Sequence, residues 1–495
     1  MRSRRQSIIT EDDDPLTIAM APPPNETEAE RQERLDAEKE AQKRSDAIDE
    51  ELNRQRLAEK RVKCVRVLLL GQSESGKSTT LKNFQLFHSS KAFRTERASW
   101  RAVVQLNVVR SIRTILELMS EVQAATAPPQ PRPTNAAPAP SYPKLTPEHL
   151  KLKMRLSPLQ QVEEALLRRL TPVGSADFEA TRLSPVTNLP YSNRLTVTGG
   201  EVAVNSSTPW KTAFTRLMAS TTRTSFDSAQ EIDFDDPKDP GVILNACAED
   251  MIRLWNDSTI KEILNVRNLR LEDLAGFFLD SLSRVTSPRY VPTDDDILRA
   301  RLKTLGVSEH RFSLKAGNMM SHDWRVFDVG GARSLRQTRT PINLLAAWAP
   351  YFDNMDAIIF LAPMSGFDQV LDEDPMVNRL EDSILLWKSI VSNPLLKATE
   401  IVLFLNKIDI FKAKLADGVQ FGKYVVSYGN RPNDFDSASR YLMKKFAGIH
   451  KSASPQPRTF YCHLTAVTDV KSTHTILNNV KDMVLRQNLV DGNLL

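Results

Sequence analysis

The sequence predicts an α/β fold, in which a doubly wound, mostly parallel sheet carries an inserted all-helical region. Short apolar runs with the pattern of buried strands alternate with helical patterns near residue 65 and again from Trp324 onward. Between about 90 and 300, strand signals are few and apolar residues recur at helical spacing. Because strands that alternate with helices favour a parallel sheet, we expect one sheet domain interrupted by a helical insertion.

The N-terminal part of the chain is expected to lie outside both the sheet domain and the helical insertion. Residues 1–24 are charged and contain prolines, a composition typical of disorder. From Glu26 to about Arg61 the chain is rich in Glu, Lys, Arg, Gln and Ala and has no Gly or Pro, which predicts a long exposed helix. Its apolar residues are too sparse to bury one face. A solvated arm and a partner-docking helix are therefore equally compatible with this segment taken alone.

The elements that follow are predicted from apolar runs and the turn residues that flank them. The expected strands cover Val65–Leu70, Trp324–Gly331, Asp356–Pro363, Glu400–Asp409 and Arg458–Val467. Helices are expected at Leu150–Leu170, Ile252–Leu264, Leu271–Leu282, Asn378–Ile390 and Thr473–Gln487. Ala127–Pro143 and about 172–240 are rich in Pro, Ser, Thr and Asn, so we predict low-complexity insertions there.

Composition argues against several classes of protein. The 495 residues include 66 basic and 61 acidic side chains, a balance that gives no sign of nucleic-acid binding. The three cysteines, Cys64, Cys247 and Cys462, are far apart and lack metal-binding spacing, so a reducing compartment is expected. No apolar run approaches the roughly 20 residues that span a bilayer, and the basic N-terminus lacks the apolar stretch of a signal peptide.

The first predicted strand is followed by a glycine-rich turn that is typical of phosphate binding. Residues 71–78 match the pattern GxxxxGK[ST] between a strand and a helix. Gly71 and Gly76 let the backbone curl, so that its N–H groups and the positive end of the helix face a phosphate. Lys77 would reach the β and γ phosphates, and the Ser78 hydroxyl would bind Mg²⁺. The residues expected to hold GTP or GDP here are Glu74, Ser75, Gly76, Lys77, Ser78 and Thr79.

Asp328-Val-Gly-Gly331 supplies a second part of the expected site. An aspartate at the carboxyl end of a strand can hold Mg²⁺ through a water molecule, and the Gly331 N–H can then meet the γ-phosphate. The pattern is weak alone, since many strands end in an aspartate and a glycine turn. It gains weight because a phosphate-binding turn precedes it.

Asn406-Lys407-Ile408-Asp409 follows an apolar run and indicates selectivity for guanine. Asp409 can accept hydrogen bonds from the N1–H and the 2-amino group of guanine, whereas adenine would leave this carboxylate unpaired. The Lys407 stem can lie across the base, and Asn406 is expected to tie the loop together. A backbone N–H of Ala466 or Val467, also after a predicted strand, could reach guanine O6.

Together these motifs resemble those of the α subunits of heterotrimeric G proteins, the Gα family. Residues 290–306 (YVPTDDDILRARLKTLG) are similar to the linker and switch I of that family, and Leu254–Leu264 and Leu271–Val285 are similar to parts of its helical domain. The resemblance covers nearly all of 45–121 and 248–495. Fungal members with an expanded helical domain are the most similar.

The resemblance implies further roles at the site. Arg301 would be the catalytic arginine that stabilises charge on the transferring phosphoryl group. Thr304 would be the second hydroxyl ligand of Mg²⁺. Glu74 would pair with Arg301 across the cleft, and Leu298 and Arg299 would line the nucleotide.

The resemblance also implies partners and a division into domains. The helix at 25–62 would dock Gβγ, and the last helix and the tail would meet a seven-helix receptor, while the effector is not identified. The Ras-like GTPase domain would comprise 63–90 and 300–495. The helical domain would comprise 91–299, with insertions at about 122–247. The last helix starts just after Thr465–Asp469, the loop expected to reach guanine O6. A receptor that binds the tail could therefore loosen the base site.

Switch II departs from the family pattern Asp-x-Gly-Gly-Gln. Ala332 stands at the fifth position, where a methyl group cannot orient the attacking water as a glutamine does. We therefore expect GTP hydrolysis below the roughly 10⁻² s⁻¹ of Gα proteins with their arginine in cis. A GTPase-activating protein that steadies this glutamine would help little. Gln337 is not expected to replace it.

Two other functions compete with a cycling GTPase. Ala332 favours a GTP-loaded binding switch or scaffold with negligible turnover. A P-loop ATPase or kinase is disfavoured by the sequence at 406–409, which is suited to guanine.

Attachment to a membrane is expected to depend on partners. The second residue is Arg2 rather than glycine, and no cysteine precedes Cys64, so the N-terminal lipidation motifs of the family are absent. Arg2, Arg4 and Arg5 would each add about 1 kcal/mol of attraction to anionic lipid, and Asp12–Asp14 would oppose it. The expected location is the cytoplasm, peripherally at the inner face of the plasma membrane.

Overall fold

The computed structural model divides the chain into two compact units, Met1–Cys64 and Val65–Leu495. It describes residues 27–61, 64–88, 93, 97–126, 142–170, 203–205, 234, 239–267, 269–301, 303–305, 307–315, 321–330, 355–371, 374, 376–397 and 399–491. Three parts of the predictions lie outside these ranges. They are residues 1–24, which were predicted to be disordered, most of the predicted insertions, and the switch II residues from Gly331 onward.

The first unit contains one long helix, α2 (Glu28–Arg61). Its side chains are exposed almost throughout the part where exposure is described, including the apolar Ile48 and Leu52. Ion pairs one turn apart, such as Arg34–Glu38 at 2.9 Å, support an exposed helix by about 0.2–0.5 kcal/mol each. The long exposed helix predicted from composition is confirmed.

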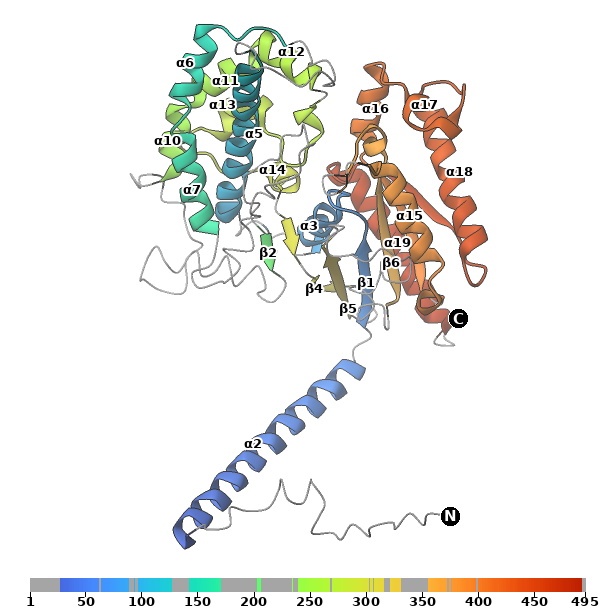
Figure 1. The fold of residues 1–495 in the computed structure, drawn as a ribbon. Helices are drawn as coiled ribbons and strands as arrows, with labels where there is room; N and C mark the ends of the chain where they lie inside the picture. The colour runs from blue at the N-terminus through green and yellow to red at the C-terminus, as the bar shows by residue number, and fades with distance from the viewer. Residues whose placement is uncertain are drawn as a thin grey trace, which may run out of the picture. The chain divides into compact units, whose positions relative to one another are not determined.

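The second unit is built on a six-stranded sheet (Figure 1). In spatial order its strands are β4 (Val307–Lys315), β5 (Ser321–Val329), β1 (Cys64–Leu70), β6 (Ala357–Pro363), β7 (Glu400–Asn406) and β8 (Tyr461–Thr465). The pairs β1–β6, β6–β7 and β7–β8 are parallel, whereas β4 and β5 pair antiparallel. The predicted mostly parallel sheet is confirmed, with an antiparallel edge that was not predicted.

Helices cover both faces of this sheet. They are α3 (Lys77–His88), α15 (Arg379–Val391), α16 (Ile408–Ala416), α17 (Phe421–Tyr424), α18 (Phe435–Ala453) and α19 (Val470–Asp491), with the 3₁₀ turns η7 (Met364–Asp368), η8 (Pro394–Leu396) and η9 (Val426–Tyr428). Val67 and Leu69 of β1 belong to the apolar cluster that includes α3 and α19, whereas Leu68 and Leu70 belong to the cluster that includes α15 and α18. Since successive side chains of a strand point to opposite faces, an unbroken apolar run suits a strand that is buried on both sides.

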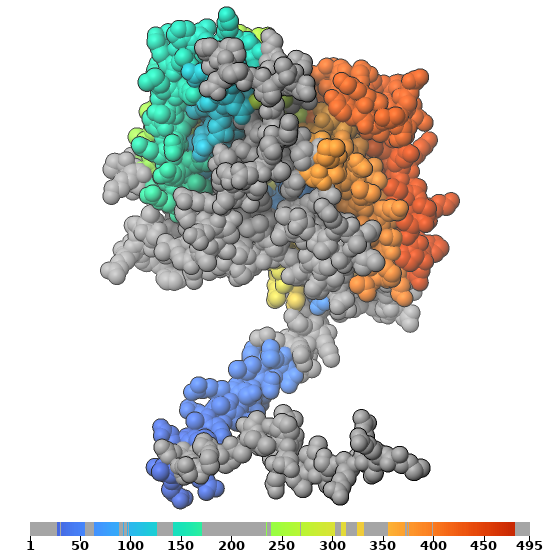
Figure 2. Space-filling view, in the orientation of Figure 1, coloured from blue at the N-terminus to red at the C-terminus, as the bar shows by residue number. Residues whose placement is uncertain are grey.

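The helical region between the first strand and the rest of the sheet has its own core. Its elements are α5 (Arg97–Thr126), α6 (Pro147–Arg155), α7 (Leu159–Leu170), α10 (Pro240–Ala246), α11 (Ala248–Asn256), α12 (Ser258–Val266), η2 (Leu271–Asp273), η3 (Leu279–Ser281), α13 (Leu282–Val285) and α14 (Asp294–Arg299). One hydrophobic cluster within residues 93–300 contains residues of all these elements except α6, and it is distinct from both clusters of the sheet. In Figure 2 the teal helical segments and the orange and red segments after residue 355 occupy opposite sides of the face shown.

One short strand comes from the predicted insertion. β2 (Ala203–Asn205) pairs in parallel with β3 (Lys303–Leu305), and Val204 lies opposite Thr304. Part of the insertion therefore lies beside the segment that resembles switch I. Within the described ranges, none of the helices combines the length and apolar character needed to cross a bilayer.

Three of the predicted helices are divided or shortened. Leu150–Leu170 forms α6 and α7 rather than one helix, because Pro158 lacks the N–H that a continuous helix requires. Ile252–Leu264 is interrupted at Asp257, whose carboxylate caps α12 by accepting from two main-chain N–H groups. Leu271–Leu282 contains η2 and η3 and only the first residue of α13. The helical character predicted for these places is confirmed, but each range is divided among two or more elements.

The predicted strands are confirmed with shifted ends. The strand expected at Glu400–Asp409 ends at Asn406, because Lys407 has a φ of +61° and leaves the extended conformation. The strand expected at Arg458–Val467 is shorter, Tyr461–Thr465. The helices expected at 378–390 and 473–487 are confirmed as α15 and α19.

Phe360 tests the assignment of β6 to the core. It is fully buried, and its ring centroid lies 5.2 Å from that of Trp387 in α15. Phe360→Ala would leave a cavity, so it is expected to lower the free energy of unfolding by about 3–5 kcal/mol. Leu385→Ala, at a position on α15 that is 51% exposed, is the control, with an expected change within about 1 kcal/mol. Equal losses in the two variants, measured by chemical denaturation, would contradict the assignment.

Candidate functional site

The candidate site lies at the carboxyl ends of the parallel strands β1 and β7. The turn 71–76 joins β1 to α3 at this edge, where open α/β sheets bind their ligands. Gly76 has a φ of +103°, and a Cβ at this position would lie 2.3 Å from Nδ2 of Asn406. Only glycine combines this conformation with this closeness to the neighbouring loop.

Lys77 is the first residue of α3 and is almost fully buried. Its Nζ donates to the carbonyl oxygens of Gly71 at 2.9 Å and Gln72 at 2.8 Å. These bonds hold the ammonium group against the turn that the sequence assigns to the phosphates. A cation beside the N-terminal end of a helix is an arrangement that binds anions.

Ser78 and Asp328 form a pair of oxygen groups beside this turn. The Ser78 hydroxyl donates to Asp328 Oδ2 at 2.7 Å, and Asp328 is buried near the end of β5. Mg²⁺ prefers oxygen ligands and takes only a few from the protein at phosphate sites, so the pair fits this ion. Thr304, the other expected ligand, lies in β3, but its side chain is outside what the structure describes, as is Gly331. Among the residues that are described, no three His, Cys, Asp or Glu side chains form a metal-binding group.

Asn406 ties the base loop to the phosphate turn and to the loop after β8. Its Nδ2 donates to the Ser75 carbonyl at 2.7 Å. Its Oδ1 accepts from the Thr465 hydroxyl at 3.1 Å and from the Val467 N–H at 3.2 Å. The prediction that Asn406 holds the loop together is confirmed. The Val467 N–H already donates to Asn406, so it could donate to a ligand only by sharing its hydrogen between the two acceptors.

The remaining residues of the base loop face the same space. Lys407 has the left-handed φ of +61°, and burial lowers its pKa to about 8, although the carboxylate of Glu74 acts in the opposite direction. Asp409 lies in the first turn of α16, where the Thr468 hydroxyl donates to its Oδ2 at 3.5 Å. The Asp409 carboxylate is therefore positioned by the helix and the neighbouring loop.

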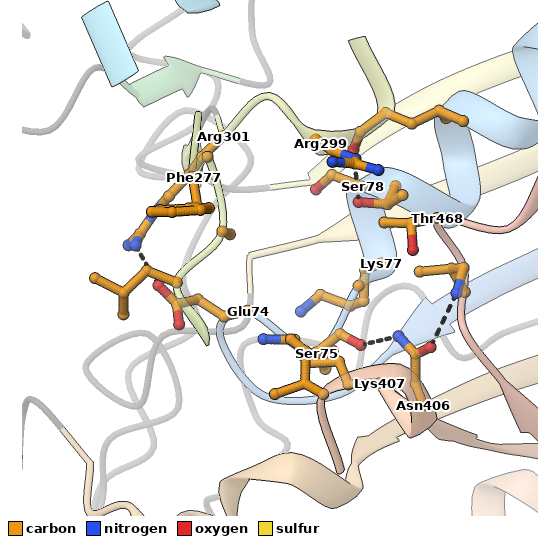
Figure 3. A pocket seen from close by; sticks show the side chains of 18 of the residues that line it. Glu74, Ser75, Lys77, Ser78, Phe277, Arg299, Arg301, Asn406, Lys407 and Thr468 are labelled. Atoms are coloured by element: carbon orange, nitrogen blue, oxygen red, sulfur yellow. Dashed lines mark hydrogen bonds and ion pairs between the residues drawn. The ribbon is translucent and has the colours of Figure 1, made fainter. Parts of the chain in front are cut away.

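Glu74 is the buried anion of the site (Figure 3). Its carboxylate pairs with Arg301 and, at 3.1 Å, with Arg379 of α15. Burial alone would raise the pKa of Glu74, but the charges of Arg301, Arg379 and Lys407 hold it well below its usual range. The predicted pair with Arg301 is confirmed. Glu74 and Lys407 are also the two non-glycine residues with positive φ among those described, and such strain often marks a functional site.

One wall of the site comes from the helical region and was not predicted. Asp273, Leu274, Gly276 and Phe277 line the cavity, and Figure 3 shows Phe277 beside Arg301. Asp273 Oδ2 also pairs with Nζ of Lys414 in α16 at 2.9 Å. No motif marks this segment. The one signal available was its position within a stretch that resembles the helical domain.

Most of the predicted nucleotide-binding residues come together around one cavity of about 380 Å³, a volume typical of small-molecule sites. Those that line it are Glu74, Ser75, Gly76, Lys77, Ser78, Thr79, Leu298, Arg299, Arg301, Asn406, Lys407, Asp409 and Val467. Asp328 is not among the lining residues but contacts one of them, Ser78. Ala466 precedes Val467 and also lies outside the lining.

Three features define a P-loop nucleotide-binding protein: a glycine-rich turn between a strand and a helix, a buried lysine at the start of that helix, and a hydroxyl–carboxylate pair beside it. The sequence model of the family described as G-protein alpha subunit matches residues 42–484. The chain belongs to this family, whose members are guanine-nucleotide-binding signal transducers and GTPases.

Fungal relatives resemble the chain over nearly its whole length. It is 32% identical to the guanine nucleotide-binding protein alpha-4 subunit of Mycosarcoma maydis, over 96% of this chain and 94% of the relative. It is 30% identical to the alpha-1 subunit of the same organism, over 92% of this chain and 98% of the relative. A guanine nucleotide-binding protein subunit alpha of Coprinellus congregatus is 28% identical, over 92% and 97%. The predicted resemblance to fungal Gα subunits is confirmed.

Asn406→Ala tests the tie between the two loops. The substitution leaves the Ser75 carbonyl and the Val467 N–H without their partner, so it is expected to lower the free energy of unfolding by about 1–3 kcal/mol. Asn479→Ala, at an exposed position on α19, is the control and should change it by less than about 0.5 kcal/mol. Thermal unfolding in the same buffer measures both. A loss no larger than that of the control would show that these hydrogen bonds do not hold the site.

Proposed function

We propose that this chain is a Gα subunit that alternates between GDP-bound and GTP-bound states downstream of a seven-helix receptor. The observation that carries the proposal is a single cavity lined by the phosphate turn, by Arg301 on its Glu74 partner, and by the guanine-loop residue Asp409. GTP and GDP would be the ligands, and hydrolysis of GTP to GDP and phosphate the reaction.

At the phosphate end the turn and its lysine would bind the ligand. Main-chain N–H groups from Glu74 to Thr79 would face the phosphates, and Lys77 would exchange its carbonyl partners for β and γ oxygens. Ser78 and Thr304, with Asp328 through water, would hold Mg²⁺, which neutralises charge on these oxygens. The hydrogen bond between the Ser78 hydroxyl and the Asp328 carboxylate supports the assignment of these two residues to Mg²⁺.

At the other end Asp409 would select guanine. Its carboxylate would accept from N1–H and from the 2-amino group, and the stem of Lys407 would lie across the base. Ala466 would offer its N–H to O6, or Val467 would share the N–H that it gives to Asn406. Leu298, Arg299 and the unpredicted wall at Asp273 and Leu274 would enclose the nucleotide from the side of the helical region. These assignments make the cavity selective for guanine at one end and for phosphate at the other.

Hydrolysis would depend on Arg301 and would be slow. Its guanidinium lies at the P-loop glutamate, from which it could move to oxygens of the transferring phosphoryl group. Water would attack the γ-phosphorus as the bond to the β–γ bridging oxygen breaks. Ala332 provides no group that orients this water, so we propose a rate below that usual for the family. For the same reason a GTPase-activating protein that works through the missing glutamine would have little effect.

A GTP-loaded binding switch or scaffold with negligible turnover is the second candidate, and Ala332 is the observation that favours it. The nucleotide found on the purified protein separates the two functions. A cycling GTPase would carry mostly GDP, whereas a nearly static switch would carry mostly GTP.

We also propose the division into a GTPase domain at 63–90 and 300–495 and a helical domain at 91–299. The separate apolar clusters support it, because each part has a core of its own. The exposed helix at 25–62 would dock Gβγ. That partner would hold the chain at the inner face of the plasma membrane.

Coupling to a receptor would run through α19. Asn83 of α3 donates to the Val467 carbonyl at 2.8 Å, and Phe87 of α3 lies 4.3 Å from His474 of α19 between ring centroids. The helix therefore begins beside the base loop and also contacts the helix that follows the phosphate turn. A receptor that displaces the end of α19 would loosen the base site, as proposed from the sequence, and through α3 it would also disturb the phosphate turn.

Selectivity for guanine is the first test. Wild-type protein with Mg²⁺ is expected to bind GDP and GTP and to be unaffected by excess ATP. Asp409→Ala should weaken GDP binding by about 10- to 100-fold, because the N1–H and 2-amino donors lose a charged acceptor. Asp436→Ala, at an exposed position on α18, should leave the affinity unchanged. Displacement of a fluorescent GDP analogue measures each affinity, and equal competition by ATP would refute the proposal.

Restoring a glutamine tests the role of Ala332. Wild-type protein should hydrolyse bound GTP in a single turnover more slowly than about 10⁻² s⁻¹. Ala332→Gln should be at least about tenfold faster, because the carboxamide can orient the attacking water. Arg301→Ala is expected to be slower than the wild type. If the wild type and Ala332→Gln hydrolyse GTP at the same ordinary rate, Ala332 does not limit the reaction.

A further inference from the structure

The main chain around Arg301 is held by groups from other parts of the fold. It continues from the end of α14 as an irregular segment, in which the Ala300 N–H still donates to the Asp296 carbonyl of that helix at 2.9 Å. The Arg299 carbonyl accepts from the Gly276 N–H at 3.1 Å, and the Ala300 carbonyl accepts from Lys82 Nζ at 2.7 Å. One of these donors comes from the helical region and the other from α3, so the segment is anchored on both sides.

Asn107 of α5 completes this arrangement at Arg301 itself. The Arg301 N–H donates to Asn107 Oδ1 at 2.8 Å, and Asn107 Nδ2 donates to the Arg301 carbonyl at 3.1 Å. The side-chain amide thus pairs with both polar groups of one residue, as a neighbouring strand would. Asn107 is 6% exposed, so both bonds are shielded from water. Only one orientation of the carboxamide satisfies both contacts.

Gly276 leaves the space that this contact needs. Its φ is +83°, and a Cβ there would lie 2.8 Å from Asn107 Oδ1 and 3.0 Å from Cβ of Arg301. Any larger residue would press on the amide and on the arginine together. Gly276 therefore packs closely against the pair of hydrogen bonds between Asn107 and the main chain of Arg301, which we call the clamp.

We propose that Asn107 is a positioning residue for Arg301, so that the helical region contributes to hydrolysis through one buried amide. This inference rests on the proposed GTPase function. The Arg301 guanidinium lies at Glu74 of the phosphate turn, while its main chain is fixed by Asn107. Because the main chain is fixed, the guanidinium can change its position only through the rotamers of the arginine side chain. A displacement of about 1 Å in such a group can cost up to about 100-fold in rate.

The test is a double-mutant cycle in the full-length chain, read as single-turnover GTP hydrolysis. Asn107→Ala should slow hydrolysis by about tenfold when Arg301 is present. In the Arg301→Ala background the same substitution should change the rate by less than about twofold, because there is no guanidinium left to position. Asn107→Asp keeps the acceptor for the Arg301 N–H but loses the donor to its carbonyl, so its rate should fall between those of Asn107→Ala and the wild type.

Thr114→Ala is the matched control. Thr114 lies two turns further along α5, and its hydroxyl donates to the Arg110 carbonyl of the same helix at 3.0 Å. This variant should hydrolyse GTP within about twofold of the wild type. Binding of a non-hydrolysable GTP analogue is measured for every variant. Asn107→Ala and Thr114→Ala are expected to bind it alike, since neither side chain lines the cavity.

The outcomes separate this inference from the proposed function. A wild type that binds no guanine nucleotide would overturn both. If the nucleotide binds, the inference alone falls in either of two cases: Asn107→Ala is as fast as the wild type, or it loses the same factor with and without Arg301. An Arg301→Ala variant as fast as the wild type would also overturn it. If Asn107→Ala fails to fold, the isosteric Asn107→Asp replaces it in the double-mutant cycle.

Discussion

The arrangement of the site depends on one buried anion, the carboxylate of Glu74. It faces Arg301 from the segment after α14, Arg379 from α15, and the positive charge of Lys407 from the base loop. Removing one partner from a buried set of charges is strongly unfavourable, because the others lose their compensation. Each cation comes from a different part of the chain, so this single carboxylate fixes the phosphate turn relative to all three. The positive φ of Glu74 persists because these contacts determine its place.

The same site lies on a polar seam between separate apolar cores. The helical region and the sheet bury their own hydrophobic clusters. Ion pairs connect the helical region with the sheet region near the cavity, including Asp273–Lys414 at 2.9 Å and Arg270–Asp417 at 2.7 Å. Ion pairs of this kind can separate with less loss of apolar burial than the opening of either core. The seam is therefore the place where a nucleotide could enter and leave while both halves stay folded.

Sequence alone located the parts of the site that need fixed residue types at fixed spacing. The glycines of the phosphate turn follow from local geometry, and the role of Asn406 was predicted from the motif at 406–409 although its contacts reach distant residues. The wall at Asp273 and the clamp at Asn107 could not, because each depends on tertiary contacts between residues far apart in the chain. β4 was missed because Val307–Lys315 is largely polar and owes its place to antiparallel pairing at the edge of the sheet. A pattern of apolar spacing carries little information about such an edge strand.

The chain treats the two requirements of GTP hydrolysis differently. Under the proposed function Arg301 would stabilise charge, and the fold already holds this residue: Glu74 pairs with its guanidinium and Asn107 with its main chain. Placement of the attacking water would fall to the side chain at Ala332, which has no polar group. An arginine of this kind contributes about 10³- to 10⁵-fold to hydrolysis, and preorganised charge is usually the largest single contribution to catalysis. A fold that retains the arginine with several supporting contacts is therefore better suited to slow turnover than to none, which favours a long-lived but finite GTP-bound state over a permanent one.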